Sequence, residues 1–201
     1  KTSKERTGII STPHGNINTP AFIFCGTKAS MKCLTMEQMK ELKSQIVLSN
    51  TYHLYVDGVK IIKKLGGLHD CTKWNGPMLT DSGGYQIFAM GYGSVSKEIK
   101  GNGSHRWKPS LKSIDETGAK FKSYKDQSIK ELTPEKSIQI QRDLGADLIL
   151  VFDECTPYNI SKEYTSDSMK RSHRWASRSI EEYKKNNDEN DKQALYGIIQ
   201  G

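Results

Sequence analysis

The 201-residue sequence contains few cysteines, and their spacing is irregular. The four are Cys25, Cys33, Cys71 and Cys155. They form no C-x-x-C pair and no Cys/His cluster with zinc-finger spacing. This scarcity argues against a disulfide-stapled secreted domain and against a zinc site built from these residues, and it favours free thiols in a reducing compartment.

The chain also lacks long apolar runs and glycine-rich phosphate motifs. No apolar stretch is long enough to cross a bilayer. The basic start, residues 1–6, is not followed by the apolar segment of a signal peptide. Neither G-x-G-x-x-G nor G-x-x-x-x-G-K-[ST] occurs, so the common nucleotide fingerprints are absent. We therefore expect a cytoplasmic protein with no membrane partner.

What the chain has in excess is positive charge. Thirty Lys and Arg against 23 Asp and Glu give a formal net charge of +7, which fits a polyanionic partner such as nucleic acid. Hydrophobic residues make up 35% and charged residues 26%, so a packed core is expected. The length suits one domain or part of a larger α/β domain.

Short apolar segments alternate with helical patterns along the chain. The expected strands are 20–24, 46–48, 78–80, 148–152 and 194–199, and the expected helices are 35–44, 59–65, 133–145 and 162–185. Such alternation predicts a parallel sheet with right-handed crossovers. Polar residues follow strand after strand, where such sheets carry their chemistry. Because no nucleotide fingerprint is present, we favour a TIM (β/α)8 barrel over an open doubly wound sheet.

Two segments carry further expectations. Residues 91–117, rich in Gly, Lys and Arg, predict an extended loop, followed by a short hairpin around 119–124, where apolar and polar residues alternate. In the long helix 162–185 one face is expected to carry Met169, Ser172, Ala176, Ile180 and Tyr183.

The segment 78–88, MLTDSGGYQIF, passes from a buried strand to a carboxylate, a hydroxyl, two glycines and an aromatic ring. The glycines allow a sharp turn or the close approach of a flat ligand, on which Tyr85 could stack. Taken alone, Asp81 and Ser82 could equally cap the helix that follows.

The polar strand ends form a set when they are taken together. They read SNTYHL at 49–54, TDSGGYQ at 80–86, FDECTPY at 152–158 and YGIIQG at 196–201, with TPHG at 12–15 and GGLH at 66–69 in support. In this order they closely resemble the tRNA-guanine transglycosylases, the queuine tRNA-ribosyltransferase family, and the resemblance runs almost from end to end.

The resemblance implies a TIM barrel with an N-terminal antiparallel ribbon. Residues 1–201 would be the N-terminal part of this single catalytic domain, with about five of its eight strands. It implies a pentosyltransferase that replaces the wobble guanine of a tRNA anticodon with a 7-deazaguanine, in the queuosine pathway, through a covalent ribosyl-enzyme intermediate. It also implies a homodimer and a zinc ion in the full-length protein. The family's nucleophilic Asp and its zinc ligands come later in its pattern, so we expect no metal ligand here and no activity from residues 1–201 alone.

The resemblance also assigns roles to individual residues. Asp81 becomes the proton shuttle and Asp153 the reader of the guanine edge. Further base contacts are expected from Ser82, Tyr85, Gln200 and Gly201, with Cys155 as a pocket wall. A Cys in this E-C-T-P context is typical of the bacterial members and favours their substrate.

Several other residues have a structural explanation that we weigh against a functional one. His53 and His69 are expected to be structural, His53 through a bond to backbone, and Trp175 is expected to pack inward. Lys97, Lys100, Arg106 and Lys108 are candidate tRNA contacts, although a charge run is usually a solvated surface. The alternative function is a catalytically silent family member that binds tRNA or pairs with an active subunit. A third, remote reading is an unrelated barrel enzyme acting on small phosphorylated substrates.

Overall fold

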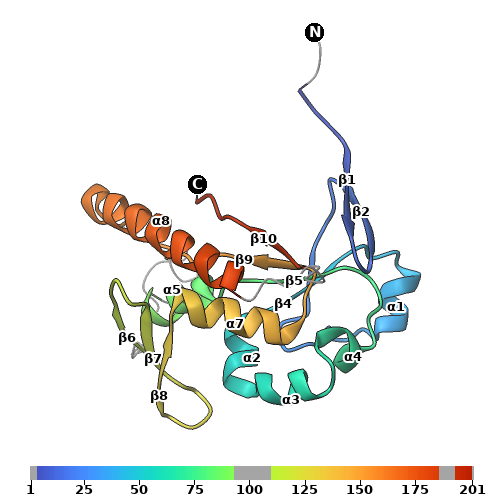
Figure 1. The fold of residues 1–201 in the computed structure, drawn as a ribbon, viewed down its shortest axis with the longest axis horizontal. Helices are drawn as coiled ribbons and strands as arrows, with labels where there is room; N and C mark the ends of the chain where they lie inside the picture. The colour runs from blue at the N-terminus through green and yellow to red at the C-terminus, as the bar shows by residue number, and fades with distance from the viewer. Residues whose placement is uncertain (1–3, 93–109, 186–192, 201) are drawn as a thin grey trace.

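The computed structural model describes residues 4–92, 110–185 and 193–200. Its centre is a five-stranded parallel sheet in the order β10-β9-β5-β4-β3 (Figure 1). The strands are β3 (Phe24–Cys25), β4 (Val47–Ser49), β5 (Met78–Thr80), β9 (Leu148–Leu150) and β10 (Ala194–Tyr196). Each of them lies beside the one before it, without the reversal of order that marks a doubly wound sheet. The predicted α/β class with a parallel sheet is confirmed.

The helices lie between these strands in the chain. They are α1 (Met36–Glu41), α2 (Thr51–Asp57), α3 (Val59–Lys64), α4 (Leu68–Thr72), α5 (Gly84–Tyr92), α7 (Pro134–Leu144) and α8 (Lys162–Lys185). Their ends follow the capping chemistry of the sequence. Thr35 and Gln38 form a reciprocal capping box at α1, with N···O distances of 3.2 and 2.9 Å. Thr133 caps α7, and Gly145 ends it at φ 72°. In the described part of the chain no helix has the length and apolarity of a membrane span.

Two antiparallel elements accompany the parallel sheet. The predicted ribbon is confirmed as β1 (Gly8–Thr12) paired with β2 (Gly15–Thr19), which stands away from the sheet in Figure 1. A second sheet orders β6 (Leu111–Ile114), β7 (Ala119–Lys122) and β8 (Ile129–Leu132).

The extended loop predicted over 91–117 is therefore wrong at both of its ends. Gly91 still belongs to α5, and Leu111 lies so close that a Cβ added at Gly91 would come within 2.7 Å of Leu111 Cδ2. Leu111 and Ile114 also pack against the core, which gives this stretch an apolar reason to be a strand. Residues 93–109, with Lys97, Lys100, Arg106 and Lys108, lie outside the described residues.

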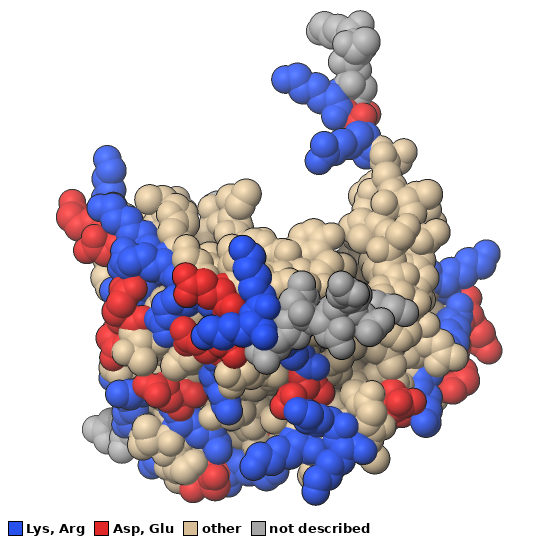
Figure 2. All heavy atoms as spheres, in the orientation of Figure 1, with Lys and Arg blue, Asp and Glu red and all other residues tan. Residues whose placement is uncertain are grey.

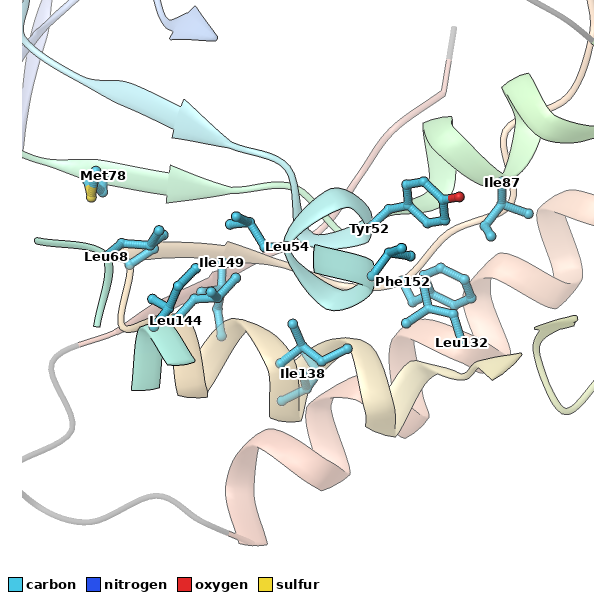
Figure 3. Packing of buried hydrophobic residues seen from close by; sticks show 14 of the residues in the cluster. Tyr52, Leu54, Leu68, Met78, Ile87, Leu132, Ile138, Leu144, Ile149 and Phe152 are labelled. Atoms are coloured by element: carbon cyan, nitrogen blue, oxygen red, sulfur yellow. The ribbon is translucent and has the colours of Figure 1, made fainter. Parts of the chain in front are cut away.

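The main core lies between the sheet and helices α7 and α8, which pack against each other (Figure 3). Trp175 is 1% exposed, as predicted, and its ring stacks on Phe152 with 4.8 Å between centroids. Of the residues predicted for one face of α8, Tyr183 packs against the core, whereas Met169 and Ile180 are 52% and 40% exposed. The buried residues of α8 are Ser168, Trp175, Ser179 and Glu182. Because the serine side chains are small, α8 can lie close to the core on both sides of the Trp175 ring.

A buried carboxylate ties the ribbon to the amino ends of two central strands. Asp147, directly before β9, bonds His14 Nδ1 of the β1–β2 turn at 2.7 Å and accepts from Met78 N at 2.8 Å. His69 Nε2 of α4 lies 3.4 Å from the second carboxylate oxygen. Burial would raise the pKa of Asp147, but the hydrogen bonds from His69, His14 and the Met78 amide outweigh it and hold that pKa below its usual value. The expectation that His69 is structural agrees with this geometry.

Removing that carboxylate should cost stability. We expect Asp147→Ala in the full-length protein to lower the unfolding free energy by about 3–5 kcal/mol, because His14 and the Met78 amide lose their acceptor and His69 keeps only its bond to the Gly76 carbonyl. Asp143→Ala on α7 is the matched control: its ion pair with Lys63, at 2.6 Å, is solvent-exposed, so about 1 kcal/mol or less should be lost. Chemical denaturation measures both, and equal losses would contradict the structural role of Asp147.

Candidate active site

The carboxylate of Asp81 lies just past β5 and is held by three nitrogen donors. Asn50 Nδ2 and Gln86 Nε2 donate to Oδ2 at 2.5 and 3.0 Å. The Thr51 amide donates to Oδ1 at 2.8 Å, and the Thr51 hydroxyl donates to the Asp81 carbonyl at 2.6 Å. Asp81 therefore bonds to the amino end of α2, which follows β4, rather than capping α5, whereas Ser82 Oγ accepts from Gly84 N at 3.1 Å at the start of α5, so the capping interpretation holds for Ser82 and not for Asp81.

Two opposing effects set the proton affinity of Asp81. Burial raises its pKa, while the bonds from Asn50, Thr51 and Gln86 favour the ionised form, as does His53 by its charge. Burial dominates, so the pKa of Asp81 lies above its ordinary value of 3.8. A carboxyl group in this setting can hold a proton more readily than an exposed Asp, yet it has donors ready to stabilise its anion.

A second carboxylate lies past the end of the neighbouring strand β9. Asp153 is 7% exposed. It accepts from Ser82 Oγ at 2.8 Å on Oδ1, and from Gln200 Nε2 on Oδ2. Burial raises the pKa of Asp153 against these hydrogen bonds, and the charge of Asp81 adds to the rise. The structure thus brings together four of the predicted site residues: Asp81 and Ser82 from one strand end, Asp153 from the next, and Gln200 from beyond β10.

The glycine pair of the motif allows this close approach. A Cβ on Gly84 would lie 2.5 Å from both the carbonyl oxygen and Oδ1 of Asp153. Gly83 has φ 90°, a conformation that favours glycine, and its Cβ would lie 2.8 Å from Leu132.

We expect Gly84→Ala to displace Asp153 and to cost about 1–3 kcal/mol of stability, because backbone atoms of the neighbouring strand end must move. Gly197→Ala is the control, since among the described residues no atom lies within 4 Å of a Cβ added at Gly197. Thermal unfolding of the two full-length variants measures the difference. Equal melting temperatures would show that the contact between Gly84 and Asp153 carries no strain.

A cavity of about 490 Å³ opens beside the Asp81 network. Asn50 and Gln86 line it together with Tyr85, whose side chain is 49% exposed, and with His53 and Cys25. Burial lowers the pKa of His53, which favours its neutral form. His53 Nδ1 and Gln86 Oε1 are buried and have no hydrogen-bond partner among the described residues, so the backbone bond predicted for His53 is not seen at Nδ1. Both atoms can accept hydrogen bonds from a ligand in this cavity.

The remaining predicted residues are placed less fully. Cys155 is partly buried, two residues after Asp153. Gly201 lies outside the described residues. Figure 2 shows Lys and Arg mixed with Asp and Glu over the face in view, rather than collected in one basic patch.

Only one group of described residues could bring three metal-ligating atoms together, and it comprises His14, His69 and Asp147. The two imidazole rings are stacked, with 3.6 Å between centroids and 15° between planes. Ring-nitrogen lone pairs lie in the ring plane, so stacked rings direct them side by side and not at one ion. The group does not fit the zinc site that the family resemblance implies for the full-length protein, and we assign it to the ribbon contact.

Sequence reasoning missed Asn50 and Gln86 as the residues that hold Asp81. Both lie within the polar strand-end segments, 49–54 and 80–86, that carry the resemblance. An amide side chain just past a buried strand was the available signal, since such a group can reach the end of the next parallel strand.

Comparison with known proteins identifies the family. The sequence model of the queuine tRNA-ribosyltransferase family matches residues 2–201. A queuine tRNA-ribosyltransferase of Protochlamydia amoebophila is 42% identical over 202 residues, covering 100% of this chain and 51% of that protein. Those of Thermoanaerobacter sp. and Prochlorococcus marinus are 46% and 44% identical, each over 98% of this chain and 47% of the relative. The chain spans about half the length of these curated relatives, and it belongs to the queuine tRNA-ribosyltransferase family.

Proposed function

We propose that the full-length protein is a tRNA-guanine transglycosylase that exchanges the wobble guanine of a tRNA anticodon for a 7-deazaguanine. The observation that carries the proposal is a pair of carboxylates, the partly buried Asp81 and the buried Asp153, at the ends of two neighbouring parallel strands. One can move a proton while the other recognises the base. Membership of the family supports this assignment.

Asp81 is proposed to shuttle the proton. When the bond between ribose C1′ and guanine N9 breaks, C1′ forms a bond to a carboxylate outside the described residues, and the leaving base takes a proton from Asp81. When N9 of the incoming base attacks C1′, the bond between C1′ and that carboxylate breaks, the carboxylate leaves as the anion, and the N9 proton of the incoming base goes to Asp81. The raised pKa lets Asp81 carry the proton that the leaving base needs in the first step. The three donors around the carboxylate stabilise the Asp81 anion until the second step returns a proton to it.

Asp153 is proposed to read the base. A carboxylate accepts two hydrogens, and a guanine-like base offers N1–H and an exocyclic N–H₂ on one edge. Each carboxylate oxygen has two lone pairs, so the bonds from Ser82 and Gln200 leave capacity for the base. Tyr85 is proposed to stack on the ring. Cys155 and the backbone at Gly201 complete the proposed wall.

The wider architecture is part of the same proposal. The five parallel strands would be part of an eight-stranded barrel whose other strands, nucleophile and zinc ligands belong to the rest of the full-length protein, which would act as a homodimer. An anticodon loop suits such a site, because its unpaired bases can be turned out of the stack. The bacterial substrate, a 7-substituted 7-deazaguanine, is favoured by Cys155.

The test is a release experiment. A tRNA carrying labelled guanine at the first anticodon position is incubated with the full-length protein and 7-aminomethyl-7-deazaguanine, and label leaving the tRNA is counted. We expect release from this tRNA and none from one with adenine at that position. Binding of tRNA without release would favour the catalytically silent role instead.

A further inference from the structure

The two strands that carry the carboxylates are joined by one backbone pair only. Between β5 and β9 the ladder holds Leu79 opposite Leu148 and then stops. On its other side β9 continues to pair with β10, and Val151 N bonds the Tyr196 carbonyl at 3.0 Å. Alternate residues of a parallel strand face alternate neighbours. The amide and carbonyl of Leu150 therefore face β5, at a level where β5 offers no backbone partner.

The side chain of Gln141 takes the place of that missing partner. It reaches in from α7 and is 0% exposed. Its Oε1 accepts from Leu150 N at 2.9 Å, and its Nε2 donates to the Leu150 carbonyl at 2.8 Å. Oε1 also accepts from the Thr80 hydroxyl of β5 at 3.1 Å, and Nε2 donates to Ser137 Oγ at 3.1 Å. All four hydrogen-bonding positions of the amide are used.

This bridge continues to the proposed base-reading group. Ser137, also 0% exposed, donates to the Ser82 carbonyl at 2.7 Å, and the Ser82 hydroxyl in turn donates to Asp153. An unbroken set of buried polar contacts thus runs from the seam between the strands to the carboxylate.

We propose that Gln141 is a positioning residue: it sets the spacing of the carboxyl ends of β5 and β9, and through Ser137 and Ser82 it fixes Asp153 for recognition of the guanine edge. The role rests on the proposed function. A side chain inserted between two strands holds them farther apart than a ladder bond would, and this spacing leaves room between the strand ends for a flat base. Without the amide, Leu150 and Thr80 lose partners inside the core and the strand ends must shift to regain them.

Base selectivity of the full-length protein tests the role. The measured quantity is the ratio of kcat/KM for labelled guanine to kcat/KM for labelled hypoxanthine, which lacks the exocyclic amine, during incorporation into tRNA. This ratio does not depend on the fraction of enzyme that is folded. We expect Gln141→Met to lower it about 10-fold, because a small misplacement of Asp153 weakens the two-point contact. Ser137→Ala, a milder change, should lower it about threefold through the same bridge.

Gln139→Met is the matched control on the same helix. Gln139 is exposed and bonds Glu182 of α8 at 2.9 Å, so its loss leaves the seam intact and the ratio within about twofold of wild type. If Gln141→Met fails to fold, Ser137→Ala decides the question. Unchanged ratios in the folded variants, or an equal fall in the control, would overturn the role of Gln141. Absence of exchange by the wild type would instead overturn the proposed function, and this role with it.

Discussion

Asp81→Asn in the full-length protein should slow guanine exchange into tRNA by about 10²–10⁴-fold. The amide keeps the shape of the carboxyl group but cannot carry the proton that the leaving base takes and the incoming base returns. It also turns an N–H₂ group towards one of three donors, Asn50 Nδ2, Thr51 N or Gln86 Nε2, which all point at this position. Initial rates of labelled guanine incorporation measure the effect.

Stability measurements show whether the slower exchange by Asp81→Asn comes from the missing carboxyl group or from misfolding. Because burial raises the pKa of Asp81 above 3.8, the fold favours its protonated form. Its contribution to stability is therefore present at low pH and is lost as the pH rises through the raised pKa. As the pH falls from 7 towards 4, the unfolding free energy of the wild type should therefore increase relative to that of Asp81→Asn. Asp143→Asn, a partly exposed control on α7, should exchange guanine within about twofold of wild type. A rate for Asp81→Asn within that same range would contradict the proton-shuttle assignment.

Asp153→Asn should change which base is accepted. The carboxylate accepts two hydrogens, whereas an amide accepts at one atom and donates at the other. We expect kcat/KM for guanine to fall roughly 10³-fold, because the N–H₂ of the variant then meets a donor of the base. Xanthine presents N1–H beside a carbonyl oxygen and matches the amide, so its incorporation should rise.

Competition between labelled guanine and xanthine measures the switch in one reaction. The Ser82 hydroxyl, which donates to Asp153 Oδ1, can donate equally to the amide oxygen of the variant, and the Gln200 side chain, which donates to Oδ2, can turn its own amide oxygen towards the new N–H₂ group. The position of the side chain should therefore be kept while its recognition pattern changes. Loss of guanine without any gain for xanthine would indicate a general disruption, and retained guanine preference would remove Asp153 from base recognition.

Local rules in the sequence were sufficient for much of the fold. The capping box of Thr35 and Gln38 and the start and end of α7 at Thr133 and Gly145 are confirmed, because caps depend on residues three or four positions apart. Periodicity alone did not identify the buried face of α8. Met169 is exposed there, and small serines beside Trp175 form the contact, which depends on the shape of the core and not on apolar content.

In the candidate site, too, the sequence predicts local features but not the contacts between distant residues. Asp81 and Asp153 could be named from the strand-end motifs. Most of the contacts around them could not, because they join residues 30 to 71 positions apart; only the bond from Gln86 to Asp81 is local. Gln141 left a faint signal: it occupies the buried stripe of α7 between Ile138 and Leu144, where an apolar residue is the ordinary choice. A buried amide at such a position indicates hidden backbone partners, but the sequence does not say which strand supplies them.

The most direct test of the two-carboxylate account is a crystal structure of the full-length protein soaked with 7-aminomethyl-7-deazaguanine. We predict that the base lies flat against Tyr85, with its N1–H and exocyclic amine on Asp153 and the Asp81 carboxyl group at its other side. A base bound elsewhere, or bound with that edge turned away from Asp153, would contradict the account.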